Sequence, residues 1–584
     1  MICLVVMLVL TGCNKTTENK RGSEEFEEFT NSLVNELISD DDFDINFLFL
    51  DPIAIGINPE LYQLPFTSLE EAKENSDYSN DVLKRLEEFD YKKLTDSQKL
   101  TYEVIKDVFE SDLDPDKFYY ISTNYLGSYL GYQAQLPLLL MEFTFNNEQD
   151  ILSYFNVLKT MEETFVEYAE LEKQRQAQGV GMPQIIIDKV IEQCINITSE
   201  DEIFLIEMIN RKIDDSTFLS DDKKAEYKER NITLLNNDYI NAYKRLGTEL
   251  STIESDIIDL GLTHLPNGKE YYEYLVKQNT GTNISVNDLK QYVDEHFDMY
   301  LDEFIKLLSN NMSVYERIYD ADTFGEFNYT SHTSFEEVID YLAIEMLKDY
   351  PEVGNLNYEV TLVPEAMADN FSPAAYLSGK IDAPIDYPER IFINGEFSQS
   401  LFETLAHEGY PGHMYQNSFF RQTDAPIIRY LFNHKAYTEG WATYVENRVW
   451  KYAEVDNEED LVLLELLKLN NQLTQMLMIQ LDIGVHYDGW SRETFKEFLI
   501  QNFGEQPDES VYDAQYDNIL ETPANTLAYY FGGAKFDELY RKAEKELGEK
   551  FDAIEFNRVV LTCGPASFEI VEKQVDNYIK ETKK

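Results

Sequence analysis

The sequence has little cysteine, little positive charge and no long hydrophobic run, and each shortage excludes a class of protein. Four cysteines in 584 residues are too few for a disulfide-stabilised scaffold. Lysine and arginine total 49 against 109 aspartates and glutamates, which gives a net charge of −60. Such a surface repels phosphate groups, so we expect no nucleic-acid partner. Hydrophobic residues reach 43 %, enough for a large folded core.

The first segment of the chain has the order of a secretion signal. The apolar run Ile2–Leu10 is far shorter than the ~20 residues of a membrane-spanning helix. It leads into residues 10–13 (LTGC), which resemble the bacterial lipobox, and the chain then becomes strongly polar. We therefore expect a signal peptide over 1–13, a polar tether over 14–24, and lipidation of Cys13. Acyl chains on Cys13 would hold the protein on the extracellular face of the cell membrane.

The rest of the chain has mainly helical periodicity. Apolar residues recur at helical spacing from Phe26 to Leu37 and again from Ile151 to Phe165, where residues 179–183 (GVGMP) mark the end of a long helix. A turn-rich break at 263–268 (THLPNG) is the expected seam between two lobes. We expect an N-terminal helical lobe over 25–262 and a C-terminal lobe over 263–584.

The second half contains the only segments that resemble strands. Tyr358–Val363 and Arg390–Asn394 are rich in β-branched and aromatic residues and are bounded by turn formers. A helical pattern follows over Ser398–His407. Leu461–Leu481 is apolar on most faces, yet its polar residues fit a buried helix better than a membrane span. The expected fold class is mainly α, with a small β-sheet beside the helix that ends at His407.

The candidate chemistry lies in two segments, 407–413 (HEGYPGH) and 438–446 (TEGWATYVE). With seven histidines and 109 acidic residues, about one histidine is expected to precede an acid by chance, so that dipeptide alone means little. A hydrolytic zinc site needs three protein ligands, commonly two histidines and a carboxylate, with an acidic residue beside the reacting water. The sequence therefore predicts His407, His413 and Glu439 as ligands of Zn²⁺ and Glu408 as the general base.

The spacing of the two histidines requires a distortion of the helix. His413 follows His407 by six positions, about 240° around an undistorted helix, so the two side chains would point apart. Proline kinks or breaks a helix when it lies in the helix interior, and glycine accepts unusual backbone angles. Pro411 and Gly412 therefore predict a bulge or break that returns His413 to the ligand side.

The two segments together resemble a known bacterial family, domain of unknown function 885. The pattern His-Glu-x-x-Pro-Gly-His followed by Glu-Gly-Trp-Ala carries the resemblance, with further matching stretches at Asp482–His486 with Trp490, Pro523–Gly532, and Gly564-Pro565. That family is similar to the glutamate-zincins, such as thermolysin, thimet oligopeptidase and angiotensin-converting enzyme. The resemblance implies a two-lobed helical zincin-like metallopeptidase, with an edge strand, a ligand helix and a second helix carrying the third ligand.

The chain departs from the family pattern at two positions. Many relatives have a second histidine directly after the one that corresponds to His413, where this chain has Met414. Many also have a histidine where this chain has Asn557. We therefore expect that Met414 is not a ligand and that Asn557 has no catalytic role.

Two further glutamates are candidates for a supporting role. Glu446 follows Glu439 by seven residues and so lies on the same helix face, as a supporting residue or as a replacement ligand. Glu403 precedes His407 by one turn, where it either orients the imidazole or is a solvated helix glutamate.

The resemblance also implies residues that act on the substrate. In similar peptidases, histidines and tyrosines outside the metal shell stabilise the oxyanion, which assigns that role to His486 and Tyr529. Asp482, four residues before His486, is expected to orient its imidazole. The strand ending in Ile393 and Asn394 is expected to pair with an extended peptide substrate.

These predictions amount to a cell-surface zinc metallopeptidase that cleaves short peptides. Two alternatives stay open: a non-catalytic lipoprotein that binds peptides or another ligand, and a metal-dependent hydrolase of non-peptide amides or esters. The oligomeric state and any pairing of Cys194 with Cys563 stay open as well.

Overall fold

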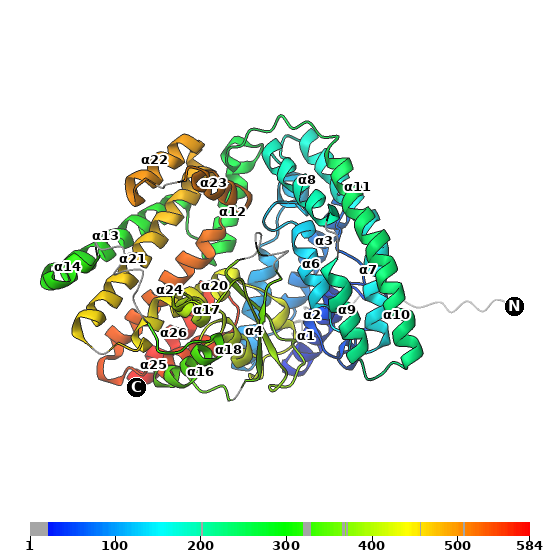
Figure 1. Ribbon diagram of the computed structural model, residues 1–584. Helices are drawn as coiled ribbons and strands as arrows, with labels where there is room; N and C mark the ends of the chain where they lie inside the picture. The colour runs from blue at the N-terminus through cyan, green and yellow to red at the C-terminus, as the bar shows by residue number, and fades with distance from the viewer. Residues whose placement is uncertain are drawn as a thin grey trace, which may run out of the picture.

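A computed structural model describes residues 21–199, 203–318, 329–354, 356–364, 368, 372–455, 457–505 and 508–584. Figure 1 shows a mainly helical molecule with a small β-sheet near its middle. Cys13 and the predicted signal peptide lie outside the described residues. No helix in the part of the chain that the structure describes has the length and hydrophobicity needed to cross a membrane.

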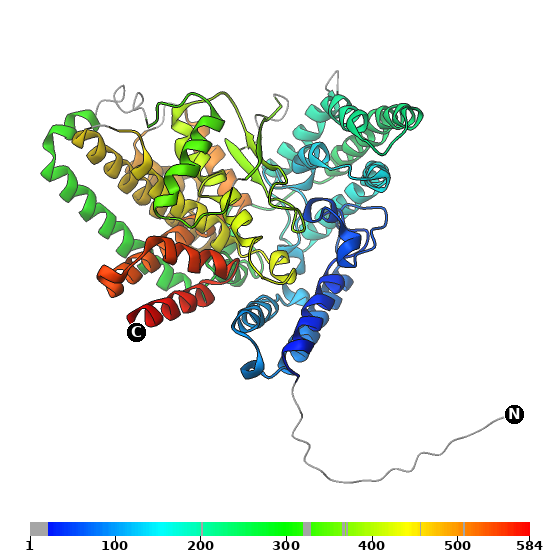
Figure 2. The same ribbon diagram turned by 90° about the horizontal axis from the view of Figure 1, so that it is seen from below.

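The first half of the chain forms helices that gather on one side of the molecule (Figures 1 and 2). The predicted long helix is confirmed as α7, which begins after the side-chain cap of Asn147 and ends before Gly179, a residue with φ of 73°. The helices on this side are α1 (Ser23–Leu37), α2 (Ile45–Leu48), α3 (Leu69–Glu87), α4 (Asp96–Glu110), α5 (Pro115–Ser122), α6 (Tyr132–Glu142), α7 (Glu148–Ala177), α8 (Gln184–Ser199), α9 (Phe204–Asp215), α10 (Asp221–Leu234) and α11 (Ile240–Leu250).

The second half forms the opposite side and carries the predicted site. Its helices are α12 (Gly268–Thr280), α13 (Val286–Asn310), α14 (Met312–Ile318), α16 (Phe335–Glu345), α17 (Phe402–Glu408), α18 (His413–Phe420), α19 (Ile428–Leu431), α20 (Lys435–Val449), α21 (Glu458–Ile483), α22 (Arg492–Phe503), α23 (Ser510–Glu521), α24 (Asn525–Leu547), α25 (Ala553–Cys563) and α26 (Phe568–Lys583). The predicted helix over 461–481 is α21. A lobe boundary at residue 263 stays a prediction.

The sheet has three strands in the order β1-β3-β2. Both predicted strands are confirmed, as β1 (Tyr358–Leu362) and β3 (Glu389–Ile393), which pair in parallel. The third strand, β2 (Ala374–Leu377), pairs antiparallel with β3 and was missed because four residues give too short an alternating pattern. β3 is therefore the central strand, and β2 is an edge strand.

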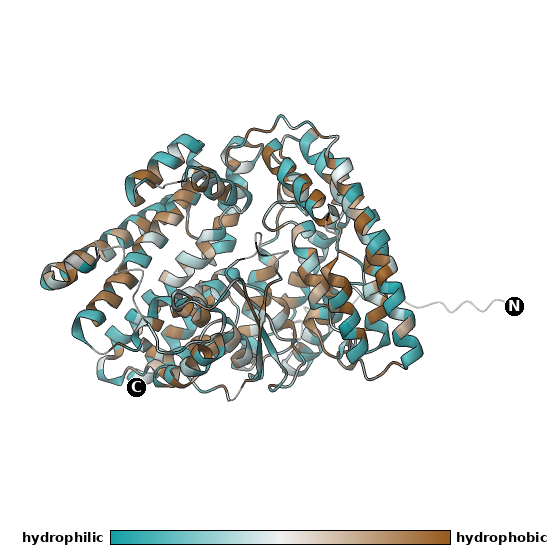
Figure 3. Ribbon diagram, in the orientation of Figure 1, coloured by the Kyte–Doolittle hydropathy of each residue, from teal (hydrophilic) through white to brown (hydrophobic). Residues whose placement is uncertain are grey.

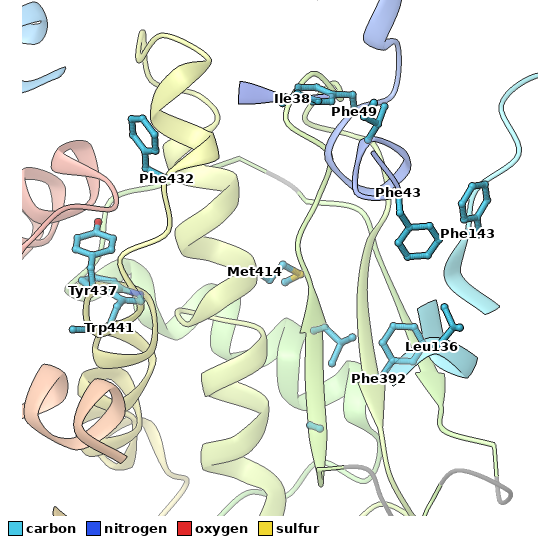
Figure 4. Packing of buried hydrophobic residues seen from close by; sticks show 14 of the residues in the cluster. Ile38, Phe43, Phe49, Leu136, Phe143, Phe392, Met414, Phe432, Tyr437 and Trp441 are labelled. Atoms are coloured by element: carbon cyan, nitrogen blue, oxygen red, sulfur yellow. The ribbon is translucent and has the colours of Figure 1, made fainter. Parts of the chain in front are cut away.

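One large hydrophobic cluster runs through both sides of the molecule, from Phe26 to Ile579. Figure 3 shows hydrophobic and hydrophilic residues recurring along the helices, as expected for helices that pack on a core with one face. Figure 4 shows part of this cluster, with Met414 pointing toward the strands of the sheet. Met414 is fully buried among apolar side chains, which agrees with its expected absence from a metal site. Cys194 and Cys563 are both buried and unpaired.

Candidate metal centre

The two histidines come together because the chain leaves one helix and starts another. α17 ends at Glu408 and α18 begins at His413, so the predicted distortion is a complete break. A Cβ atom on Gly412 would lie 1.8 Å from the carbonyl oxygen of His407, so only glycine allows this close return of the chain. The indole Nε1–H of Trp441 donates to the carbonyl oxygen of Pro411 at 2.9 Å and fixes the connection against α20.

The break brings four candidate side chains to one point. The imidazole rings of His407 and His413 lie edge to face, with centroids 4.7 Å apart. The Nε2 atoms of His407 and His413 lie 3.9 Å and 3.2 Å from the same oxygen, Oε2 of Glu439. One ligand atom each of His407, Glu408 and His413 falls within 4.8 Å of the others. The structure thus places together the three predicted ligands and the predicted base.

Glu439 is positioned by a close crossing of α20 and α24. A Cβ atom on Gly440 would lie 2.6 Å from Cα of Gly532, so the backbones of the two helices touch at these glycines. The crossing brings Tyr529 of α24 beside Glu439. Burial, the charges of Glu439 and Glu408, and a hydrogen bond to Glu439 raise the pKa of the Tyr529 hydroxyl. Tyr529 therefore lies at the site, where the resemblance placed it.

Glu446 bonds the His407 imidazole at Nδ1, whereas Nε2 is the ring nitrogen that lies near Glu439. Oε1 of Glu446 lies 2.8 Å from Nδ1 of His407, so Nδ1–H donates to Glu446 and Nε2 is the ring nitrogen that could bind a metal. Glu403 does not orient the His407 imidazole, because among the described residues no hydrogen bond joins Glu403 to His407. Burial and the nearby charge of Glu446 raise the pKa of Glu403 to about 7. The prediction that Glu403 orients His407 is therefore wrong, and Glu446 does so.

Charge compensation dominates the electrostatics of the cluster. Burial alone would lower the pKa of His407. The charge and the hydrogen bond of Glu446, with smaller contributions from the charges of Glu408 and Glu439, instead raise this pKa to about 9. Burial alone would raise the pKa of Glu439, but the hydrogen bond and charge of His413 hold it below its ordinary value. A concentrated negative charge therefore surrounds the two imidazoles, as a cation-binding site requires.

Glu408 is held by a residue that the sequence patterns did not single out. The backbone N–H of Tyr376 in β2 donates to Oε2 of Glu408 at 2.7 Å. The Tyr376 hydroxyl donates to Oε2 of the buried Glu389 at 2.6 Å. The edge strand is thereby fixed next to the candidate base. No motif marks Tyr376, since its contact to Glu408 uses the backbone.

The predicted oxyanion role of His486 is wrong. His486 is fully buried in a π-helical turn, Gly484–Asp488. Its Nε2–H donates to the carbonyl oxygen of Ile519 at 2.8 Å, and its Nδ1 accepts from the N–H of Leu262 at 3.3 Å. Both ring nitrogens are thus occupied by backbone groups that tie segments together, and neither faces the metal cluster.

The predicted partnership of Asp482 with His486 is also wrong. The carboxylate of Asp482 accepts hydrogen bonds from the Tyr272 hydroxyl, the N–H of Ala524 and the Thr526 hydroxyl. Asp482 therefore anchors the start of α24, where Ala524 has a φ of 61°. Helical spacing brought the two side chains onto neighbouring turns, but each is held by different groups: His486 by two backbone groups, and Asp482 by two hydroxyls and one backbone N–H.

Ile393 and Asn394 do not offer a substrate-binding edge. Ile393 is fully buried, and β3 has a neighbouring strand on each side. The backbone N–H of Asn394 donates to Pro373, and its side-chain amide donates to Ala368. An edge prediction needs the strand order, which local periodicity does not contain.

The donor set fits a zinc ion. Ligand atoms about 2.0–2.2 Å from a tetrahedral zinc lie about 3.3 Å apart. The separation between His413 and Glu439 is 3.2 Å, and that between His407 and Glu439 is 3.9 Å. Two neutral imidazole nitrogens and one carboxylate oxygen are the common ligand set of catalytic zinc, and the Glu446 contact to Nδ1 is the usual support for a metal-binding histidine.

Comparisons with known proteins place the chain in a family. The sequence matches the family model "Bacterial protein of unknown function (DUF885)" over residues 53–575. No curated protein matches it. A crystal structure described as "the putative lipoprotein from Colwellia psychrerythraea" has a TM-score of 0.80 and 18 % identity, covering 96 % of this chain and 99 % of that chain.

A second structure, described as "a putative lipoprotein of unknown function from Shewanella oneidensis", has a TM-score of 0.60 and 16 % identity, covering 94 % of this chain and 99 % of that chain. At these identities the two structures show a shared fold. The family model matches nearly the whole chain and includes both segments of the candidate site. The chain belongs to the DUF885 family of bacterial proteins.

Proposed function

We propose that this protein is a zinc-dependent peptidase with the catalytic arrangement of the glutamate-zincins. The observation that carries the proposal is the convergence of the His407 and His413 Nε2 atoms on Oε2 of Glu439, directly beside Glu408. His407, His413 and Glu439 would hold the zinc ion. When bound, zinc would polarise the scissile carbonyl group and lower the pKa of the reacting water.

The protein's own residues then supply acid–base chemistry and orientation. Glu408 would take the proton of the attacking water and pass it to the leaving amine. Tyr529, held beside Glu439, would donate a hydrogen bond to the oxyanion. Glu446 would keep His407 in the tautomer that presents Nε2 to the metal. The edge strand β2 takes over from β3 as the segment that would pair with an extended peptide.

We also propose that the enzyme works at the cell surface on short peptides. The lipobox-like sequence at 10–13 supports a lipid anchor on Cys13, and two structures of the same fold are described as putative lipoproteins. An acylated cysteine would attach the protein to the membrane, and the expected face is the extracellular one.

The decisive experiment combines metal analysis with a peptide library. Purified protein should contain one zinc ion per chain and should cleave members of the library, with products identified by mass spectrometry. Glu408→Gln should retain zinc and lose about 100-fold or more in kcat, because it removes the general base. Glu497→Gln is the matched control, because Glu497 is exposed on α22.

Three outcomes would overturn the proposal in different ways. Protein without zinc and without activity would favour a non-catalytic binding lipoprotein. Zinc-loaded protein that cuts no peptide would favour a hydrolase of other amides or esters. Equal activity of the Glu408→Gln and Glu497→Gln variants would remove Glu408 from the mechanism.

A further inference from the structure

The helices α20 and α24 lie side by side and carry two matching pairs of side chains at the metal centre (Figure 1). Glu439 of α20 pairs with Tyr529 of α24. One turn earlier on both helices, the ammonium group of Lys435 donates a hydrogen bond to Oδ1 of Asn525. The two helices therefore run past the site in the same direction. Lys435 precedes Glu439 by four residues, which is about 6 Å along the axis of α20.

Lys435 is a cation without an anionic partner. Among the residues that the structure describes, no carboxylate forms an ion pair with its ammonium group, and the group that it bonds, the Asn525 amide, is neutral. Burial lowers the pKa of Lys435, and the charge of Glu439 offsets this effect in part. An ammonium group has three N–H donors, of which Asn525 takes one. Two donors of a partly buried charge are thus left for a ligand.

The metal centre does not account for this lysine. Burial alone would raise the pKa of Glu439; His413 lowers it most, His407 follows, and Lys435 contributes less than either histidine. Glu439 thus has its partners without Lys435. Lys435 and Asn525 are only half-buried, as are Glu439 and Tyr529. Solvent therefore reaches both pairs of side chains, so a ligand at the metal can extend to Lys435.

The spacing limits which part of a peptide meets Lys435. An extended peptide advances about 3.3–3.6 Å per residue. With the scissile carbonyl group at the metal ligands, a group at Lys435, about 6 Å along the helix, lies one or two residues beyond the cleaved bond. A chain with a net charge of −60 repels free carboxylates over most of its surface, so a substrate carboxylate bound here needs a dedicated cation.

We infer, on the basis of the proposed peptidase function, that Lys435 binds the C-terminal carboxylate of the substrate, so that the enzyme removes one or two residues from the C-terminus of a peptide. Water adds across the cleaved bond, and the products are a shortened peptide and a free amino acid or dipeptide. An ammonium–carboxylate hydrogen bond is roughly twice as strong as a neutral one. A C-terminal carboxamide lacks the charge and should bind more weakly.

The test compares N-acetylated peptides that end either in a free carboxylate or in a carboxamide. For the zinc-loaded wild-type enzyme, kcat/KM for the acid should exceed that for the amide by about tenfold or more. Mass spectrometry should identify the released amino acid or dipeptide from the C-terminus. Acetylation of the N-terminus should change kcat/KM less than about threefold, because the inference places no recognition there.

Substitutions at Lys435 connect this preference to one side chain. Lys435→Met removes the charge and should lower kcat/KM for the acid about tenfold, with little change for the amide. Lys435→Arg keeps the charge and should keep most of the preference. The ratio of acid to amide cancels any general effect of the substitutions on the metal site. Lys159→Met is the matched control, because Lys159 is exposed on α7, and it should leave the ratio unchanged.

The outcomes separate this inference from the function on which it rests. Equal cleavage of acid and amide at internal bonds overturns the inference and leaves the peptidase intact. An acid preference that survives in Lys435→Met, or an equal loss of both activities in that variant, also overturns it, since Lys435 would then not bind the carboxylate. Failure to cleave any peptide overturns both the inference and the proposed function.

Discussion

At the scale of single residues, Glu446, Glu403 and His486 differ in the groups that their side chains contact. Glu446 and Glu403 both had helical spacing toward the site, yet Glu446 alone bonds His407. His486 lies in a stretch that matches the family pattern, yet both of its ring nitrogens bond to the backbone. We therefore assign His486 to the structure of the molecule and Tyr529 to the site.

Replacement of His486 should separate these two roles. We expect His486→Gln to lower the free energy of unfolding by about 1–3 kcal/mol, because at least one buried backbone group loses its partner. The kcat of peptide hydrolysis should change less than threefold. A loss of 100-fold or more in kcat with unchanged stability, the pattern of an oxyanion-stabilising residue, would contradict this assignment. Denaturant titration and steady-state kinetics on the same preparation measure both quantities.

The same residue predicts a pH dependence of stability. Burial lowers the pKa of His486 to about 4, against about 6.5 in an unfolded chain. Between these two pKa values the unfolded chain binds more protons than the folded chain. The stability that the neutral, buried imidazole contributes is therefore fully present above pH 6.5 and is lost as the pH falls toward 4. The slope reaches about 1.4 kcal/mol per pH unit.

Comparison of wild type with His486→Gln isolates this slope. Burial raises the pKa of Asp482 to about 7, which gives an opposite slope in the same window, but Asp482 is present in both proteins. Urea unfolding at pH 4.5, 5.5 and 6.5 should show a shallower loss of stability on acidification for the variant. Identical slopes would contradict a neutral buried His486.

At the scale of elements, the site depends on two close approaches of backbone. One is the return of the chain at Gly412 onto His407, and the other is the crossing of α20 and α24 at Gly440 and Gly532. These two close approaches explain why glycine lies near the candidate ligands in segments 407–413 and 438–446, since a Cβ atom on Gly412 or Gly440 would clash with backbone atoms. Pro411 and Gly412 were sufficient to predict that the helix would be interrupted. The helix crossing was not predictable, because it joins segments distant in the sequence.

Substitution at the crossing should disrupt the site without touching a ligand. Gly440→Ala places a Cβ atom against the backbone of Gly532, so the helices must separate, and we expect a loss of about 1–3 kcal/mol in unfolding free energy. Zinc affinity should fall as well, because Glu439 moves with α20. Gly247→Ala is the matched control: its Cβ would meet Cys194 at an ordinary 3.5 Å, and alanine favours a helix.

Calorimetry of metal binding and denaturant unfolding of both variants test this account of the crossing. Equal stability and equal zinc affinity of the two variants would show that the α20–α24 contact does not position the site.

At the scale of the whole molecule, the sequence predicted a mainly helical fold with a small β-sheet, and it singled out four side chains that lie close together, but it did not predict the arrangement around them. Helical periodicity and turn residues were sufficient for α7, α21, β1 and β3, because these elements have strong local patterns. Strand order and the edge position of β2 depend on contacts between distant segments. The substrate-facing predictions at Ile393, Asn394 and His486 failed for that reason.

A metal that binds only the folded chain should stabilise the whole molecule. At a free zinc concentration 100 times the dissociation constant, linkage gives about 2.7 kcal/mol. We expect the midpoint of thermal unfolding to rise with zinc and to fall after chelation, and His413→Ala should abolish both changes. A zinc-dependent rise that persists in His413→Ala would place the metal elsewhere.

The central claim is that His407, His413 and Glu439 hold one zinc ion, and anomalous X-ray diffraction at the zinc edge tests it most directly. Crystals of zinc-supplemented protein should give a single strong anomalous peak within bonding distance of Nε2 of His407, Nε2 of His413 and a carboxylate oxygen of Glu439. The Glu408 carboxylate should lie next to the zinc ion. A zinc-supplemented crystal with no peak among these three residues would contradict the claim.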